Sequence, residues 1–128
     1  MRWISAALMI AVFGHGALAQ APGDMASRAS FCAGVIDKGL AISRSDRSDG
    51  SDAQTKQIVA DLREGLTRDR ERLRRFLLPY TTDQGPLTTA REEGARLEQE
   101  CNSSMERGQT NSEACVRVTP CFDLDWLP

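Results

Sequence analysis

Apolar residues recur every three to four positions along three long segments of this chain, and polar stretches separate the segments. At 3.6 residues per turn, this spacing places the apolar side chains on one face of an α-helix. We expect helices over residues 24–44, 51–78 and 89–108, followed by a short fourth helix that begins at Thr110 and ends before Pro120. The pattern predicts an all-α fold, a small bundle of three to four helices with an irregular C-terminal tail.

The first expected helix carries its apolar side chains on one stripe, formed by Met25, Ala29, Cys32, Ile36 and Leu40. Asp24 is expected to cap the first turn by accepting from a backbone N–H. Gly34 and Gly39 each weaken a helix by about 1 kcal/mol relative to alanine. Because Gly39 lies near the stripe, we expect it to let a neighbouring helix come close.

The second expected helix begins with a capping box from Ser51 to Gln54 and ends at Leu78, before Pro79. Its stripe comprises Thr55, Ile58, Val59, Leu62, Leu66, Leu73, Phe76 and Leu77. At 1.5 Å per residue it spans about 40 Å, against about 30 Å for the first helix. We therefore expect either a bend near Gly65 or an overhanging end.

Asp69 interrupts the second stripe, at an angle where Leu or Ile is expected. A carboxylate in an apolar pocket has a raised pKa and suits proton transfer. The alternative is an ion pair with Arg72 one turn later, or with an arginine of the facing helix. We favour the ion pair, because no second catalytic group accompanies Asp69.

The third expected helix starts at the capping box Thr89-x-x-Glu92 and ends near Gly108. Its stripe consists of Ala90, Gly94, Leu97, Cys101 and Met105. A further capping box, Thr110-x-x-Glu113, predicts the short fourth helix, which carries Cys115 and Val116. The loop at residues 43–51 has no apolar residue and reads as a polar linker.

The N-terminus has the pattern of a secretory signal. Arg2 precedes an apolar run over residues 3–13 and a stretch of small residues, in which Ala17 and Ala19 form an A-x-A site. We expect cleavage after Ala19, which leaves Gln20 first. The run is shorter than the ~20 residues that span a bilayer. The expected organisation is a signal peptide over 1–19 and one domain over 20–128, with a linker at 43–51 and a tail at 119–128.

The expected location is the periplasm if the source is a Gram-negative bacterium, and otherwise the extracellular space. The net charge of −2 becomes −3 once Arg2 is removed, with both signs interspersed, so we expect no nucleic-acid partner and no affinity for anionic lipid. The expected partner is another envelope or extracellular protein. Only 24 large apolar residues remain after cleavage, which is a lean core that needs additional bracing.

Four cysteines provide that bracing, because exported proteins meet an oxidising environment. The favoured pairing is Cys101–Cys115 across a helical hairpin, with Cys32–Cys121 holding the tail to the first helix. The rival pairing is Cys32–Cys101 with Cys115–Cys121. Each disulfide is worth about 2–4 kcal/mol.

Candidate chemistry is sparse. The one histidine, His15, lies within the expected signal peptide, so histidine-based triads and zinc sites are excluded from the cleaved chain. Four glutamates crowd the third helix, namely Glu92, Glu93, Glu98 and Glu100, and charged helices commonly have this composition. We expect no enzyme, no cofactor and no metal. A carboxylate-based hydrolase centred on Asp69 is the weakest alternative.

The leading hypothesis is a binding module that acts through a surface, and the next is a structural or stress-protective envelope protein without a specific ligand. Candidate interaction residues lie in the tail: Phe122, Leu124, Trp126 and Leu127. The favoured alternative is that the tail folds back and completes the core. Arg68, Arg72 and Arg75 form a weaker candidate surface for an acidic partner, or simply a solvated helix face.

Overall fold

The computed structural model describes residues 23–45, 52–80 and 84–128. The expected signal peptide with its cleavage site, most of the polar linker and Ser51 lie outside these residues. The described part contains α2 (Asp24–Ser45), α3 (Ala53–Leu77), α4 (Pro86–Glu106), α5 (Glu113–Val118) and a 3₁₀ turn, η1 (Thr119–Phe122).

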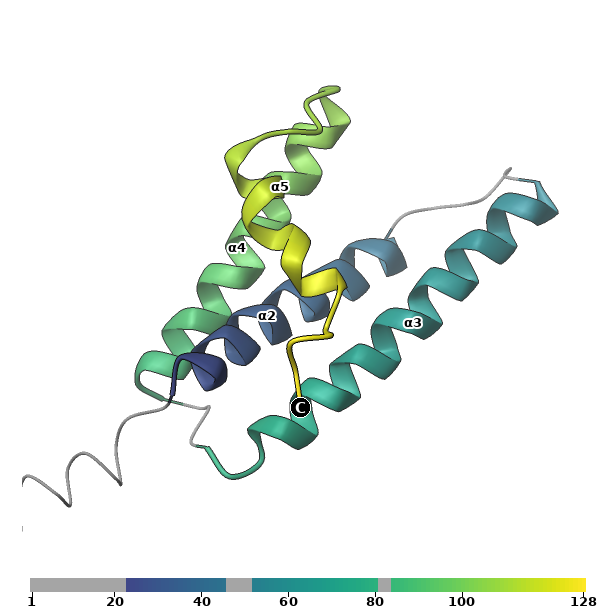
Figure 1. Cartoon of the computed structure of the whole chain (residues 1–128). Helices are drawn as coiled ribbons and strands as arrows, with labels where there is room; N and C mark the ends of the chain where they lie inside the picture. Colours follow the sequence, from purple (N-terminus) through teal and green to yellow (C-terminus); the bar gives the residue numbers. More distant parts are fainter. Residues whose placement is uncertain (1–22, 46–51, 81–83) are drawn as a thin grey trace, which may run out of the picture.

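No strand occurs in these three ranges, and the all-α bundle predicted from the sequence is confirmed. Figure 1 shows α2 lying between α3 and α4, with α5 and η1 crossing beside it. The long helix α2 is therefore the centre of the bundle, since both other long helices pack on it.

The first two helices start one residue away from their predicted caps. The carbonyl of Gly23 accepts the first backbone hydrogen bonds of α2, so Asp24 lies inside the first turn instead of capping it. At α3 the cap is Asp52, whose carboxylate accepts from the backbone N–H of Thr55 at 2.7 Å. The predicted cap at Ser51 is therefore wrong by one position.

The next two predicted caps are also displaced. Helix α4 begins at Pro86, with Gly85 before it at φ +79°, because proline at the first helical position loses no hydrogen bond. Thr89 thus lies in the first turn. Helix α5 is capped by Ser112 and not by Thr110.

The end of α4 follows the prediction. Gly108 adopts φ +77°, a conformation that glycine takes without steric cost. Its N–H donates to the Met105 carbonyl, and the N–H of Gln109 donates to the Ser104 carbonyl, both at 2.9 Å. These paired bonds are a Schellman motif, which turns the chain towards α5.

Helices α2 and α4 cross at two glycines. A Cβ added to Gly34 would lie 1.9 Å from the backbone oxygen of Arg91, and one added to Gly94 would lie 2.0 Å from that of Phe31. Any side chain at either position would push the helices apart. The close approach predicted at Gly39 is wrong, because a Cβ there would make only ordinary contacts of 3.9 Å or more.

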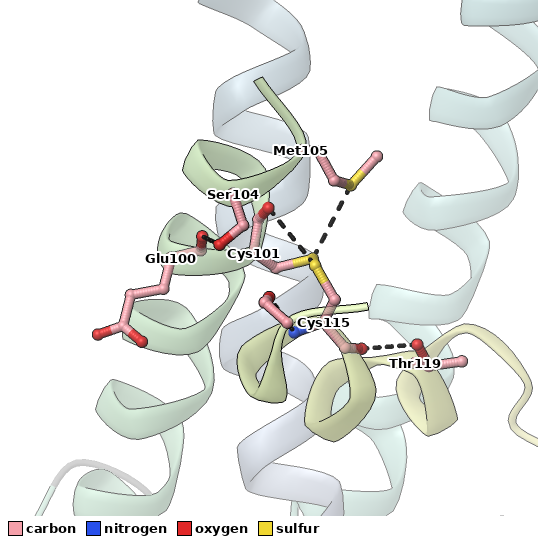
Figure 2. The surroundings of a disulfide bond; sticks show 7 residues. Glu100, Cys101, Ser104, Met105, Cys115 and Thr119 are labelled. Atoms are coloured by element: carbon pink, nitrogen blue, oxygen red, sulfur yellow. Dashed lines mark hydrogen bonds between the residues drawn. A yellow bond between two sulfur atoms is a disulfide. The ribbon is translucent and has the colours of Figure 1, made fainter. Parts of the chain in front are cut away.

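Two disulfides brace the bundle, and they are the pairs that the sequence favours. The tail disulfide joins Cys32 to Cys121, 89 residues apart, and the hairpin disulfide joins Cys101 to Cys115, 14 residues apart. Figure 2 shows how the hairpin disulfide connects α4 to α5. The four sulfur atoms all lie in the apolar core.

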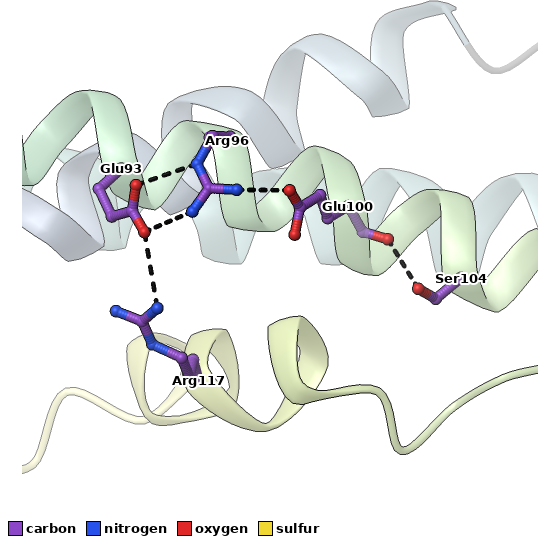
Figure 3. A network of polar contacts seen from close by, with 5 residues as sticks. All are labelled: Glu93, Arg96, Glu100, Ser104 and Arg117. Atoms are coloured by element: carbon purple, nitrogen blue, oxygen red, sulfur yellow. Dashed lines mark hydrogen bonds and ion pairs between the residues drawn. The ribbon is translucent and has the colours of Figure 1, made fainter.

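Helices α4 and α5 are also joined by a chain of charged side chains. Figure 3 shows Arg96 between Glu93 and Glu100, with Arg117 of α5 reaching the Glu93 carboxylate at 3.5 Å. Arginine lowers the pKa of Glu93 through its hydrogen bonds. Two of the four glutamates that crowd α4 are therefore held by arginines on the bundle surface.

The tail completes the core, as the favoured alternative predicted. Leu124 and Leu127 are buried, in one cluster with Leu73 and Leu77 of α3. The guanidinium of Arg28 lies 4.3 Å from the centre of the Trp126 ring. This stacking and the tail disulfide hold the C-terminus against the helices.

The N-terminal half of α3 projects beyond the rest of the core. No residue from Ala53 to Gly65 is buried, whereas Leu66, Leu73 and Leu77 are. Helix α3 is continuous, so its greater length relative to α2 results in an overhanging end and not in a bend. As a consequence, Ile58 and Leu62 are exposed.

Candidate functional site

An apolar groove of about 410 Å³ lies where the overhanging half of α3 faces the ends of α2, α4 and the C-terminal elements. Helix α2 contributes Gly39, and α3 contributes Leu62 and Leu66. The hairpin disulfide also lines the groove, through both of its cysteines. The walls therefore come from segments far apart in the sequence that the bundle brings together.

Exposed apolar side chains gather at this groove. Leu62, Met105 and Phe122 are 58%, 55% and 45% exposed, and each comes from a different element. The sulfur of Met105 lies 3.9 Å from that of Cys101, so the flexible Met105 side chain rests against the disulfide (Figure 2). Large apolar side chains left in water around one concavity are typical of a binding surface.

Among the described residues that line the groove, Glu98 is the one that carries a charged side chain. It is half-buried on α4, and its Oε2 atom is buried with no hydrogen-bond partner in the described part of the chain. Burial raises the pKa of the Glu98 carboxyl from 4.5 to about 7. This carboxyl therefore exchanges its proton near neutral pH, unlike those of Glu93 and Glu71, whose pKa values are lowered by arginines.

The backbone of α2 gives the Glu98 carboxyl its space. An added Cβ on Gly39 would lie 3.9 Å from Oε1 of Glu98 and 4.0 Å from Cδ1 of Leu66. Glycine at this position thus leaves bare backbone beside the carboxyl. Among the described residues, none donates a hydrogen bond to the buried Oε2 atom of Glu98.

The predicted role of Asp69 is wrong. The residue is half-exposed, and no ion pair in the described part of the chain includes it. The pair expected with Arg72 is therefore not formed. The carboxyl with the raised pKa lies on α4 at Glu98, a residue that we grouped with solvated surface glutamates.

A signal for Glu98 was present in the sequence. At 100° per residue, position 98 lies about 40° from Gly94 and about 20° from Met105 around the helix. Glu98 is therefore inside the apolar stripe of α4 just as Asp69 is inside that of α3. The three other glutamates of this group concealed the position of Glu98 in the stripe, because composition does not separate the faces of a helix.

The predicted arginine surface lies on the outside of α3. Arg68, Arg72 and Arg75 are exposed on α3. Glu71 pairs with Arg74 at 2.6 Å. These three arginines are therefore open to solvent, and their role in binding an acidic partner stays a prediction.

Other arginines do line a cavity, of about 300 Å³, between α2, α3 and the start of α4. Arg70, Arg74 and Arg91 surround Asp37, which pairs with Arg91 at 2.7 Å and with Arg70 at 4.0 Å. The aspartate already neutralises part of this positive charge. Arg70 and Arg74 belong to the basic run of α3 that the sequence displays, whereas Asp37 and Arg91 were not singled out.

The tail candidates divide between core and surface. Leu124 and Leu127 are buried and Trp126 is half-buried, so these three residues pack in the fold. Phe122 is exposed and lies at the groove. The predicted tail surface therefore reduces to one residue, which joins side chains that come from α3 and α4.

Across the described ranges, no helix is long and apolar enough to cross a membrane, and no group of three or more His, Cys, Asp or Glu residues is arranged to hold a metal ion. Comparisons of the chain with protein-family models, curated proteins and solved structures find no match.

Proposed function

We propose that this protein is an exported, non-enzymatic binding module, and that the groove beside Glu98 is its binding site for a ligand with an apolar body. The observation that carries this proposal is the convergence of Leu62, Met105 and Phe122 on one concavity. These side chains stay exposed in a chain that has few large apolar residues to spare.

The groove has the size and composition of a small-molecule site. Its volume of about 410 Å³ falls within the range of roughly 300–1,000 Å³ typical of ligand pockets. Each Å² of apolar surface that a ligand removes from water contributes about 25 cal/mol. Covering the three exposed side chains would therefore give a driving force that the free protein lacks.

The walls of the groove are held in place before a ligand arrives. The hairpin disulfide fixes α5 on α4, and the tail disulfide fixes η1 on α2. A preformed site loses less conformational entropy on binding than a flexible one. The hairpin disulfide, which lines the groove, thus supports a preformed site.

Export is supported by the same cross-links and by the N-terminal pattern. Disulfides persist in oxidising compartments, and the sequence before Gln20 has the order of a secretory signal. The ligand would then be a molecule of the envelope or the extracellular space. N-terminal sequencing of protein made in its native host tests this part, and we expect Gln20 as the first residue.

Octanol is a suitable probe for the groove, since it has an apolar chain and no charge. We expect octanol to raise the melting temperature of the oxidised protein and to bind with a negative heat-capacity change in calorimetry. Leu62→Ser should weaken binding about tenfold. Leu62 is 58% exposed, so the substitution costs the fold little.

Ile58→Ser is the matched control, because Ile58 precedes Leu62 by one turn and is 60% exposed but does not line the groove. It should leave octanol binding unchanged. The proposal fails if octanol does not bind, or if the two variants bind it equally well. Either result would leave a structural envelope role as the better explanation of the fold.

A further inference from the structure

Glu98 is an acid without a partner in the place where a ligand would lie. Its Oε2 atom is buried without a hydrogen bond in the described residues, while its side chain lines the groove. Buried carboxylates are normally paired or hydrogen-bonded, because removing an unpaired charge from water is costly. The free protein therefore holds an acid that its own fold does not satisfy.

Among the described residues that line the groove, no other element supplies an opposite charge to this carboxyl. The lining residues from α2, α3, α5 and η1 carry no titratable side chain, apart from Cys115, which is tied up in the hairpin disulfide. On α4 itself, the groove meets Cys101, Asn102 and Met105, which are also uncharged. The described lining of the groove therefore leaves a positive charge to be supplied by a ligand.

We propose that the groove selects amphiphilic amines: the ligand's ammonium group pairs with the Glu98 carboxylate while its apolar chain covers Leu62, Met105 and Phe122. This inference rests on the proposed function and adds the chemical class of the ligand. An ammonium group donates three hydrogen bonds and supplies the missing charge in one step. The ligand's apolar chain would lie along the rest of the groove, where the other described lining residues are uncharged.

Proton exchange at Glu98 gives this selection a pH dependence. Below the raised pKa the carboxyl is neutral and gives an amine little advantage over an alcohol of the same length. Above it the carboxylate attracts the ammonium, which stays protonated throughout because alkyl amines, like lysine, titrate near pH 10. Preference for the amine should therefore grow as the pH rises through neutrality.

Octylamine and octanol form a matched pair of probes, since they share the chain and differ in the head group. In calorimetry on the oxidised wild-type protein at about pH 8, we expect octylamine to bind about tenfold more tightly than octanol, as a hydrogen-bonded charge pair implies. At about pH 5 the ratio should fall towards one. Octanoate, with a like charge, should bind more weakly than octanol at about pH 8.

Two variants separate the groove from general charge attraction. Glu98→Gln should abolish the amine preference while octanol binding remains. Asp69→Asn removes one carboxylate from α3 outside the groove and should keep the preference. The inference is overturned if wild-type protein binds both probes equally at about pH 8, or if the preference survives in Glu98→Gln.

These outcomes are distinct from failure of the proposed function. If octanol binds and responds to Leu62→Ser but octylamine has no advantage, the groove is an apolar site without amine selection. If neither probe binds, both proposals fail. The wild-type pH comparison needs no variant, so the inference stays testable even if Glu98→Gln does not fold.

Discussion

Glu98 should make the stability of the fold fall as the pH rises through the neutral range. The unfolded chain titrates this carboxyl with the ordinary pKa of 4.5, and burial raises the folded value to about 7. Between these values the folded state binds more protons than the unfolded state, so raising the pH favours unfolding. The stabilisation is complete below about pH 4.5 and is lost above about pH 7.

The size of the effect follows from the gap between the two pKa values. One pKa unit corresponds to 1.36 kcal/mol, so 4.5 against about 7 gives about 3 kcal/mol for a dry site. Glu98 is only half-buried, and exposed side chains surround the groove. Solvent screening therefore reduces the expected loss to about 1–2 kcal/mol.

Urea unfolding of the oxidised chain at about pH 5 and about pH 8 measures this loss. Glu98→Gln removes the titration, so the wild-type protein should lose about 1–2 kcal/mol relative to this variant between the two pH values. Glu71 and Glu93 have lowered pKa values and titrate below this window in both proteins, so their contributions cancel. Asp69→Asn is the control for a simple change of net charge and should track wild type.

A constant free-energy difference between wild type and Glu98→Gln at both pH values would refute the reasoning. It would mean that the Glu98 carboxyl is hydrated in solution and that the groove around it is wetter than its apolar lining suggests. Direct titration of the Glu98 carboxyl by NMR would then report a pKa near 4.5.

Three further predictions concern the fold. In urea unfolding, Gly34→Ala should destabilise the protein by about 1–3 kcal/mol, because the added Cβ meets the Arg91 backbone. Gly65→Ala has open space around it and should stabilise the protein by about 0.5–1 kcal/mol. Equal effects would contradict the close crossing of α2 and α4. Replacing both cysteines of the tail disulfide by serine should cost about 4–5 kcal/mol of stability, and replacing those of the hairpin disulfide about 3 kcal/mol, because the tail disulfide closes the longer loop. Calorimetric unfolding measures both losses, and the reverse order would count against loop entropy as the cause. Deleting residues 123–128 should lower the melting temperature by well over 10 °C, since the buried Leu124 and Leu127 each contribute about 1.5–3 kcal/mol, and an unchanged melting temperature would show that the tail is not core.

The number and type of the helices could be predicted from the sequence, and so could the favoured disulfides. Helical periodicity is a strong signal over segments of twenty residues. The hairpin disulfide follows from two cysteines placed at similar distances from the Gly108 turn. These features depend on spacing within the chain, which a sequence displays directly.

The helix starts could not be located as well, because the capping pattern is degenerate. Ser51 and Asp52 are adjacent before α3, and Thr110 and Ser112 lie close together before α5. Each of these side chains can accept from the first turn. The structure uses Asp52 and Ser112, and at α4 it uses a proline in the first position. Local sequence does not decide among such neighbours when the tertiary fold sets the register.

The site was missed for a related reason. Periodicity gives the direction in which a side chain points, but it does not say whether another element covers it. Ile58 and Leu62 lie on the apolar stripe of α3 and are exposed, because α3 extends past the core. Only the packing of five elements reveals that the overhang leaves Glu98 in an apolar groove.

The hairpin disulfide lines the groove, so the proposed ligand site would depend on redox conditions. In a reducing cytosol, Cys101 and Cys115 would be separate thiols, and the contact between α4 and α5 would rely on Arg117 and the apolar core. The groove would then lose one rigid wall. If the proposed site binds small amphiphiles, a newly made chain would acquire the complete site only on oxidation and would not sequester them during synthesis.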